Sequence, residues 1–237
     1  MLSIHFWLWE QEQARTRYVA DHVNIAAAGV RRNLSMPHRI CCVTDMPEGI
    51  DPSIEIITPP GDFLDIKNPR WSNGRPQCYR RLSMFRRDAA DIFGERFVSM
   101  DLDAVIGGPL DPLFDRDDDL VLFKGTTRTR PYNGSMIMMK AGCRPEVYED
   151  FNQEAALESG SLFCGSDQAW LMHKLGPKEK VWDENDGVYW FGGAYRRQRL
   201  ATPPRILFFP GSLKPWDAAK VDPFTREHYR MDMMEAA

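Results

Sequence analysis

The chain has 237 residues, of which 43% are hydrophobic and 27% charged, and its formal net charge is −4. This composition excludes a disordered or fibrous chain, and the small net charge does not indicate a nucleic-acid or membrane partner. No run of 18 apolar residues is present, so we expect no integral membrane segment. The start, "MLSIHFWLWEQEQ", lacks the basic region of a secretory signal, and the five cysteines contain no C-x-x-C pair. Both features favour a reduced, cytoplasmic protein without a disulfide framework or zinc site.

Strands and helices alternate along the first part of the chain. Residues 13–34 carry apolar side chains at steps of three and four, which predicts one face of a helix. A second helix is predicted by the spacing of Leu82, Phe85, Ala89 and Ile92. We expect strands at residues 3–9, 38–45, 54–58 and 97–100. This alternation predicts an α/β fold with a mainly parallel central sheet flanked by helices, as in Rossmann-like proteins.

The segment between residues 59 and 77 is a long predicted loop rich in Pro, Gly and Asn. It is either a lid over a ligand or an ordinary surface excursion with Trp71 packed down.

The second part of the chain continues with strands predicted at residues 117–125, 132–140, 187–192 and 205–209. Helices are predicted from about 145 to 158 and over 165–176. No repeat or flexible linker divides the sequence, so we expect a single domain over residues 1–237. Residues from about 218 to 237 are expected to form a peripheral C-terminal tail, a loosely attached helix or a frayed end.

Two acids, Asp101 and Asp103, follow directly on a predicted buried strand, "RFVSM". In an extended segment residues i and i+2 point the same way, so both carboxylates can face one point. Oxygen ligands of this kind suit a hard divalent cation, Mn2+ or Mg2+. A D-x-D pair without context is more often a pair of solvated turn acids.

A second stretch, "FFPGSLKPW" near the C-terminus, gives that context. Gly211 allows close approach of the backbone, and Lys214 is followed by the rigid Pro215. A lysine presented in this way can neutralise the terminal phosphate of a leaving group. The alternative is an ordinary surface lysine beside a core aromatic, Trp216.

The ordered set "DLDAVI", "GPLDPLF", "YNGS", "SDQAW" and "FPGSLKPW" resembles the GT-A glycosyltransferases. It is most similar to the glycogenin and lipopolysaccharide-galactosyltransferase group (family 8-like) and its bacterial and phage-like relatives. The similarity runs from about Ser3 to Trp216, with the specific motifs between Tyr79 and Trp216. It implies a nucleotide-sugar cleft at the C-terminal ends of the strands. It also implies metal-dependent transfer of a hexose from a nucleoside-diphosphate sugar, usually a UDP-sugar, to an acceptor hydroxyl with retention.

The resemblance implies a role for each matching residue. Asp101 and Asp103 would hold Mn2+ or Mg2+ against the diphosphate, with Asp101 also near the ribose. Arg81, or Arg80 if the register differs by one, would contact the diphosphate or the sugar. Gly211 and Lys214 would hold the β-phosphate.

Six further residues are assigned to the sugar, the acceptor and the nucleoside. Asn133 and Ser135 would face the donor sugar and the acceptor. Asp167 and Gln168 would bind sugar hydroxyls near the reacting carbon. Thr44 would line the nucleoside pocket, together with Asp45.

One position departs from the resembling group, in which a histidine opens the last motif and completes the metal site. Here that place is Phe208, which cannot bind a metal, so we expect weaker metal binding without nucleotide. Two alternative functions stay open. One, indicated by Phe208, is a catalytically impaired nucleotide-sugar-binding protein. The other, based on the same acid pair, is a metal-dependent nuclease or nucleotidyltransferase. The sequence contains no further acid-rich motif and no basic stripe for a nucleic-acid backbone, which argues against the nuclease or nucleotidyltransferase. The acceptor (glycan, lipid-linked sugar, protein or modified base) is not indicated.

Overall fold

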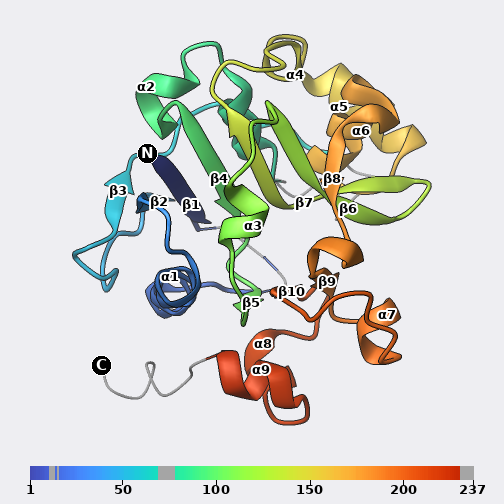
Figure 1. Cartoon of the computed structure of the whole chain (residues 1–237). Helices are drawn as coiled ribbons and strands as arrows, with labels where there is room; N and C mark the ends of the chain where they lie inside the picture. Colours follow the sequence, from blue (N-terminus) through green and yellow to red (C-terminus); the bar gives the residue numbers. More distant parts are fainter. Residues whose placement is uncertain (11–13, 15, 69–77, 230–237) are drawn as a thin grey trace. The chain divides into compact units, whose positions relative to one another are not determined.

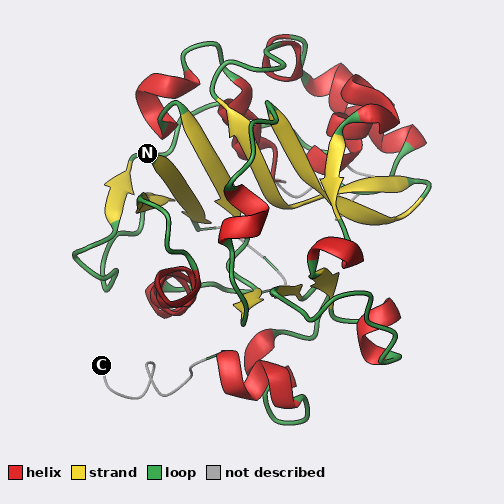
Figure 2. Cartoon of the chain, in the orientation of Figure 1, coloured by secondary structure: helices red, strands yellow, loops and turns green. Residues whose placement is uncertain are grey.

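The computed structural model describes residues 1–10, 14, 16–68 and 78–229, and the described strands form two sheets (Figures 1 and 2). The larger, mostly parallel sheet has the strand order β3-β2-β1-β4-β7-β6-β8, and the smaller has the order β5-β10-β9. The larger sheet comprises β1 (Leu2–Leu8), β2 (His38–Thr44), β3 (Glu55–Ile57), β4 (Arg96–Met100), β6 (Leu120–Thr127), β7 (Arg130–Lys140) and β8 (Lys180–Trp182). The smaller comprises β5 (Ala104–Ile106), β9 (Val188–Trp190) and β10 (Ile206–Phe208). The predicted α/β class with a mainly parallel central sheet is confirmed.

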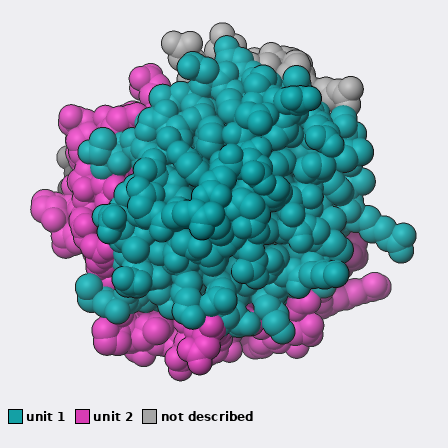
Figure 3. Space-filling model, turned by 90° about the horizontal axis from the view of Figure 1, so that it is seen from above, with its two compact units in different colours: residues 1–3, 58–99, 118–181 teal, residues 4–57, 100–117, 182–237 magenta. Residues whose placement is uncertain are grey.

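The chain divides into two compact units, coloured teal and magenta in Figure 3. Unit 1 consists of Met1–Ser3, Thr58–Ser99 and Asp118–Val181, and unit 2 of Ile4–Ile57, Met100–Asp117 and Trp182–Ala237. Neither unit is a continuous segment, because the chain passes repeatedly from one to the other.

In unit 1, the helix predicted from about 145 to 158 is two helices, α4 (Glu146–Glu149) and α5 (Gln153–Leu162). Asn152 separates them and caps α5, since its side-chain oxygen accepts a hydrogen bond from Ala155 N at 3.0 Å. A cap residue of this kind has extended backbone angles, so a helix cannot continue through it. The predicted helix of residues 165–176 is α6 (Asp167–Leu175), followed by a short 3₁₀ helix, Gly176–Lys178.

A second predicted helix of unit 1 is also divided. Cys78–Phe85 is a 3₁₀ helix, and α2 follows at Ala89–Phe93. Between them Arg86 N bonds to Ser83 O and Ala89 N bonds to Arg86 O, each at 3.2 Å, so the chain turns with three-residue spacing. The sequence spacing of Leu82 and Phe85 suits either kind of helix, which is why the pattern did not reveal the break.

Strands β6 and β7 of unit 1 form an antiparallel pair with an irregular register. Leu122 pairs with Ile137, but the next residue, Phe123, pairs with Asn133. Gly134, Ser135 and Met136 therefore form a bulge that begins inside the "YNGS" motif. Bulges re-aim side chains and occur often beside active sites.

In unit 2, α1 (Ala20–Asn33) buries the predicted face, with Val23, Ala26 and Val30 at most 3% exposed. The helix begins later than predicted. Residues 16–19 are not helical, and Val19 N instead donates a hydrogen bond to His22 Nδ1 at 3.0 Å. Residue 13, where the prediction started the helix, lies outside the described residues.

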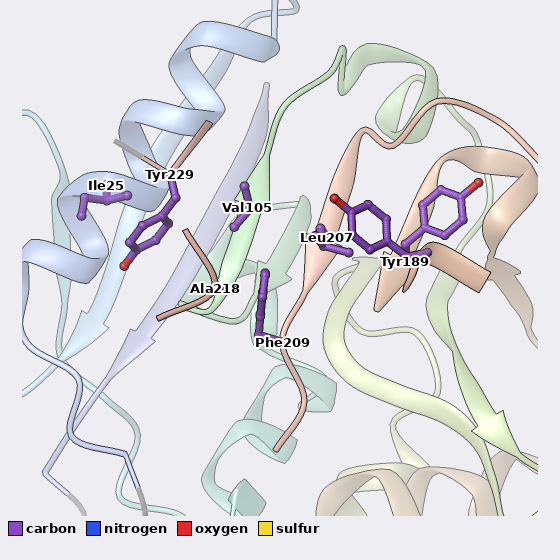
Figure 4. Close-up of a cluster of buried hydrophobic side chains, with 8 residues drawn as sticks. Ile25, Val105, Tyr189, Leu207, Phe209, Ala218 and Tyr229 are labelled. Carbon is purple, nitrogen blue, oxygen red and sulfur yellow. The ribbon is translucent and has the colours of Figure 1, made fainter. Parts of the chain in front are cut away.

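The smaller sheet lies in unit 2, where β10 pairs antiparallel with β5 and parallel with β9. Its apolar side chains join the cluster in Figure 4, whose members are Ile25, Val105, Tyr189, Tyr195, Leu207, Phe209, Ala218 and Tyr229. The other helices among the described residues of unit 2 are α3 (Asp111–Phe114), α7 (Gly193–Arg196), α8 (Pro215–Ala218), α9 (Pro223–His228) and the 3₁₀ helix Glu184–Asp186.

Helix α9 packs directly on the backbone that follows β5. A Cβ atom at Gly107 would lie 2.5 Å from carbons of Phe224 and His228, so this close approach requires glycine. Tyr229, directly after α9, is only 2% exposed.

Residues 230–237 of the predicted tail and residues 69–77 of the predicted loop, including Trp71, lie outside the described residues. Among the helices that the structure describes, none has both the length and the apolar character needed to cross a membrane.

Candidate active site

Asp103 of unit 2 is a buried carboxylate that receives two hydrogen bonds on one oxygen. It is 8% exposed, and its Oδ2 atom accepts from Lys214 Nζ at 2.5 Å and from Tyr18 Oη at 2.9 Å. Lys214 stands 111 positions further along the chain. Burial raises the pKa of Asp103, the ammonium of Lys214 lowers it, and the negative charge of Asp101 raises it. The fold thus brings together an acid and a lysine from two separate motifs.

The backbone around the two acids differs from the prediction. Leu102 and Asp103 lie in a turn rather than in an extended segment, because β4 ends at Met100 and the chain then enters β5. Leu102 is 4% exposed, as expected for a side chain that faces the core. Asp101 is partly exposed, and its charge acts on Asp103.

Lys214 is held from several sides. Its side chain is buried, its Nζ also donates to Phe209 O at 3.2 Å, and it lies 5.7 Å from the centre of the Tyr18 ring. The residue is the N-cap of α8 and has extended backbone angles, and Pro215 begins the helix. Gly211 precedes it with φ +93°, a conformation that favours glycine. The turn therefore presents the ammonium in one place.

Aromatic side chains surround this pair. The Tyr18 ring lies 6.2 Å from that of Trp216, which lies 4.7 Å from the His22 ring and 6.4 Å from the Tyr229 ring. Burial, followed by the charges of the two acids, raises the pKa of Tyr18 well above its usual range, so Tyr18 stays a neutral donor. The pKa of Tyr229 is raised by the same two causes, burial and then the charge of Asp103. Its buried hydroxyl has no hydrogen-bond partner among the described residues.

The residues present fit a divalent cation only in part. Asp101 and Asp103 supply the hard oxygen ligands that Mn2+ or Mg2+ prefers. Phe208 is the last residue of β10, is 1% exposed and pairs in register with Ala104, so it adds no ligand. No cluster of three or more His, Cys, Asp or Glu suited to a metal occurs in the described part of the chain. A cation here would need its remaining ligands from a substrate and from water.

Thr44 and Asp45 follow β2 in unit 2. Thr44 is 3% exposed, and its Oγ1 accepts a hydrogen bond from Met46 N at 2.8 Å, so the hydroxyl shapes the turn after the strand. Asp45 is exposed. A role for either residue in a nucleoside pocket stays a prediction.

Unit 1 contains a second buried ion pair. Asp167 Oδ2 accepts from Arg81 Nη2 at 2.6 Å and from Arg81 Nε at 3.2 Å, and both residues are at most 6% exposed. Ser166 Oγ donates to the other carboxylate oxygen at 3.1 Å. Arg80 has a different partner, since its Nε donates to Pro60 O at 3.2 Å. Of the two arginines considered from the sequence, Arg81 is the one that pairs with Asp167.

The other predicted site residues of unit 1 lie next to glycines: Asn133 and Ser135 flank Gly134, and Gln168 lies against Gly165. Asn133 Oδ1 accepts from Ser135 N at 2.9 Å within the bulge of β7, and both residues are partly exposed. Gln168 folds over Gly165, where a Cβ atom would lie 2.4 Å from Gln168 Nε2. Gly165 has φ +116°, which places it in the conformation that favours glycine.

Gly134 provides a direct test of how tightly the Arg81–Asp167 pair is packed. A Cβ atom there would lie 2.8 Å from Arg81 Nη2 and 3.0 Å from Asp167 Oδ2. We expect Gly134→Ala to lower the free energy of unfolding by about 1–3 kcal/mol, because the buried pair must shift. The measurement is urea denaturation.

The matched control is Gly61→Ala in the same unit, where a Cβ atom meets nothing within 4 Å. That variant is expected to change stability by less than about 0.5 kcal/mol. Equal midpoints for the two variants would contradict close packing of Gly134 against the pair.

Solved structures similar to the chain over nearly its whole length are glycosyltransferases. The galactosyltransferase LgtC, in complex with donor and acceptor sugar analogs, matches with a TM-score of 0.61 at 14% identity over 95% of this chain and 96% of LgtC. An active-site mutant of LgtC matches with a TM-score of 0.65 at 12% identity, over 99% and 95% of the two chains. The chain has the GT-A glycosyltransferase fold.

Another GT-A fold neighbour is the glycosyltransferase GlyE of Streptococcus pneumoniae TIGR4, with a TM-score of 0.61 and 15% identity over 98% of this chain and 61% of GlyE. No protein-family model and no curated protein sequence matches. The fold implied by the sequence resemblance is confirmed.

The sequence analysis did not identify Tyr18, His22 or Tyr229 as neighbours of the acid–lysine pair. Tyr18 lies two residues before the start of α1, and its hydrogen-bond partner is 85 positions away. A single tyrosine before a helix has no pattern that indicates such a partner. The acid pair itself was the available signal, because a buried carboxylate requires donors.

Proposed function

We propose that the chain is a glycosyltransferase that transfers a hexose from a nucleoside-diphosphate sugar, in particular a UDP-sugar, to an acceptor hydroxyl with retention. The fold supports this proposal, and so does the solved LgtC complex with donor and acceptor sugar analogs. The observation that carries it is the pairing of Lys214 with Asp103. This pair places the ammonium of Lys214 next to the D-x-D acids, where the metal ion and the diphosphate are proposed to bind.

In this proposal, Asp101 and Asp103 hold Mn2+ or Mg2+. When bound, the cation supplies positive charge that stabilises a diphosphate leaving group. Lys214 adds an ammonium for the same charge, and the turn at Gly211 holds it in place.

The residues of unit 1 have a different role in the proposal. Asp167, oriented by Arg81 and Ser166, binds sugar hydroxyls together with Gln168. Asn133 and Ser135, re-aimed by the bulge, contact the donor sugar and the acceptor. Thr44 and Asp45 contact the nucleoside.

We place the protein in the cytoplasm in this proposal. Cys41 and Cys42 are consecutive buried residues of β2, and neither forms a disulfide. Free thiols of this kind suit a reducing compartment.

A second candidate is a protein that binds a nucleotide sugar but no longer transfers it. The observation in its favour is Phe208, which is buried in β10 where the resembling group has a metal-binding histidine. The described residues consequently offer two carboxylates rather than a complete metal site.

The test combines binding and turnover. We expect one or more UDP-sugars, with Mn2+, to raise the melting temperature, because a ligand that binds only the native state stabilises it. The same sugars are expected to release UDP in the presence of Mn2+ and not after its removal by a chelator. Binding without UDP release across a panel of acceptors favours the second candidate, and absence of any binding contradicts both.

A further inference from the structure

The Oδ2 atom of Asp103 cannot accept a further hydrogen bond. A carboxylate oxygen offers two lone pairs, and Asp103 Oδ2 already accepts from Lys214 Nζ and Tyr18 Oη. Among the described residues, none donates a hydrogen bond to the other oxygen, Oδ1. A cation that approaches this carboxylate therefore meets an ammonium on the same group. Because like charges repel strongly in a buried site, the ion and the ammonium compete for Asp103.

The ammonium is itself costly to displace. Lys214 is 5% exposed, and its other hydrogen-bond partner among the described residues is a neutral carbonyl, Phe209 O. If Lys214 left Asp103, its charge would stay buried without an anion, which is strongly unfavourable. A new anionic partner has to arrive at the same time.

A diphosphate alone meets the opposite difficulty. It approaches two carboxylates, Asp101 and Asp103, and the ammonium of Lys214 beside them is already paired with Asp103. The anion gains a partner in Lys214 only if another cation takes over Asp103. Each ligand thus relieves the cost of binding the other.

We propose that Lys214 is the resident cation of Asp103 in the ligand-free protein, and that it makes binding of a divalent ion and of a nucleoside diphosphate mutually dependent. This inference rests on the proposed function, since it concerns the same ligands. The divalent ion replaces Lys214 at Asp103, and the released ammonium pairs with the diphosphate. Tyr18, a neutral donor, keeps the carboxylate in position during the exchange.

The experiment measures Mn2+ binding by titration calorimetry, without nucleotide and with saturating UDP. For the natural chain we expect weak binding without UDP and an affinity at least about 10-fold higher with UDP, within the range typical of coupled sites, about 5–150-fold. Because such coupling is reciprocal, Mn2+ must raise the affinity for UDP by the same factor.

The decisive variant is Lys214→Met, which removes the resident cation. We expect it to bind Mn2+ without nucleotide at least about 10-fold more tightly than the natural chain, with the effect of UDP reduced to less than about 3-fold. The matched control is Lys220→Met, which changes an exposed lysine of the same unit, 76% exposed and 3.5 Å from Asp217. Lys220→Met is expected to bind Mn2+ like the natural chain.

A second variant, Lys214→Gln, also removes the ammonium but keeps a polar side chain. It allows the same measurement if Lys214→Met does not fold. If Lys214→Met or Lys214→Gln is folded by circular dichroism yet binds Mn2+ no better than Lys220→Met, the inference is overturned. Failure of the proposed function looks different. A natural chain that releases no UDP from any UDP-sugar, while Lys214→Met binds Mn2+ more tightly, contradicts the transfer reaction and supports the exchange.

Discussion

Arg81→Met is expected to lower the free energy of unfolding by about 3–5 kcal/mol, the usual cost of removing one partner of a buried ion pair. Asp167 is 5% exposed and accepts two hydrogen bonds from Arg81, so the variant leaves a buried carboxylate with its main partner gone. Ser166 supplies one remaining donor, which is neutral. Chemical denaturation monitored by circular dichroism measures the effect as a shift of the transition midpoint.

Two further variants show whether the loss comes from the unpaired charge. The double variant Arg81→Met with Asp167→Leu removes both charges and is expected to recover most of the stability, because apolar replacement of a whole pair is often neutral. Arg87→Met changes an arginine whose side chain is 70% exposed and pairs with Glu149, so we expect a change within about 1 kcal/mol. A double variant as unstable as Arg81→Met would show that packing, not charge, dominates at this position.

Most described strands were predictable from sequence because their signal is local, but the three-residue strands β5 and β8 were not predicted. A run such as "RFVSM" is buried along its whole apolar length, and β4 begins and ends within one residue of the prediction. The breaks inside helices were not predictable in this way. Two breaks interrupt segments whose apolar spacing continues through them. Asn152 forms a helix cap, and the chain turns with three-residue spacing at Arg86.

In the candidate site, contacts between residues far apart in the sequence were not predictable either. The D-x-D pair and the lysine turn were each visible as motifs, but neither motif predicts a direct hydrogen bond between Lys214 and Asp103. Tyr18 completes that contact from outside any motif. Its hydroxyl is placed by tertiary packing against Trp216 and His22, which no periodicity expresses.

Asp103→Asn and Lys214→Met are each expected to reduce turnover of a UDP-sugar by about 10²–10³-fold, or about 2.7–4 kcal/mol of transition-state stabilisation. The reason is that negative charge grows on the diphosphate as it leaves the sugar. In the proposed reaction Asp103 holds the divalent ion and Lys214 supplies the ammonium that meet this charge. Both groups are buried, where electrostatic effects are larger than in water. Release of UDP under saturating donor and Mn2+ gives kcat for each variant.

The two effects are not expected to add. Because Asp103 and Lys214 act on the same charge, the double variant Asp103→Asn with Lys214→Met is expected to lose little more than either single variant. It also removes both members of a buried pair, so it separates loss of catalysis from loss of folding. Asp217→Asn and Lys220→Met change an exposed acid and lysine of unit 2 and are expected to keep kcat within about 2-fold. Full turnover in a folded Asp103→Asn variant contradicts metal binding by this acid, since an amide cannot replace the carboxylate charge that a divalent ion requires.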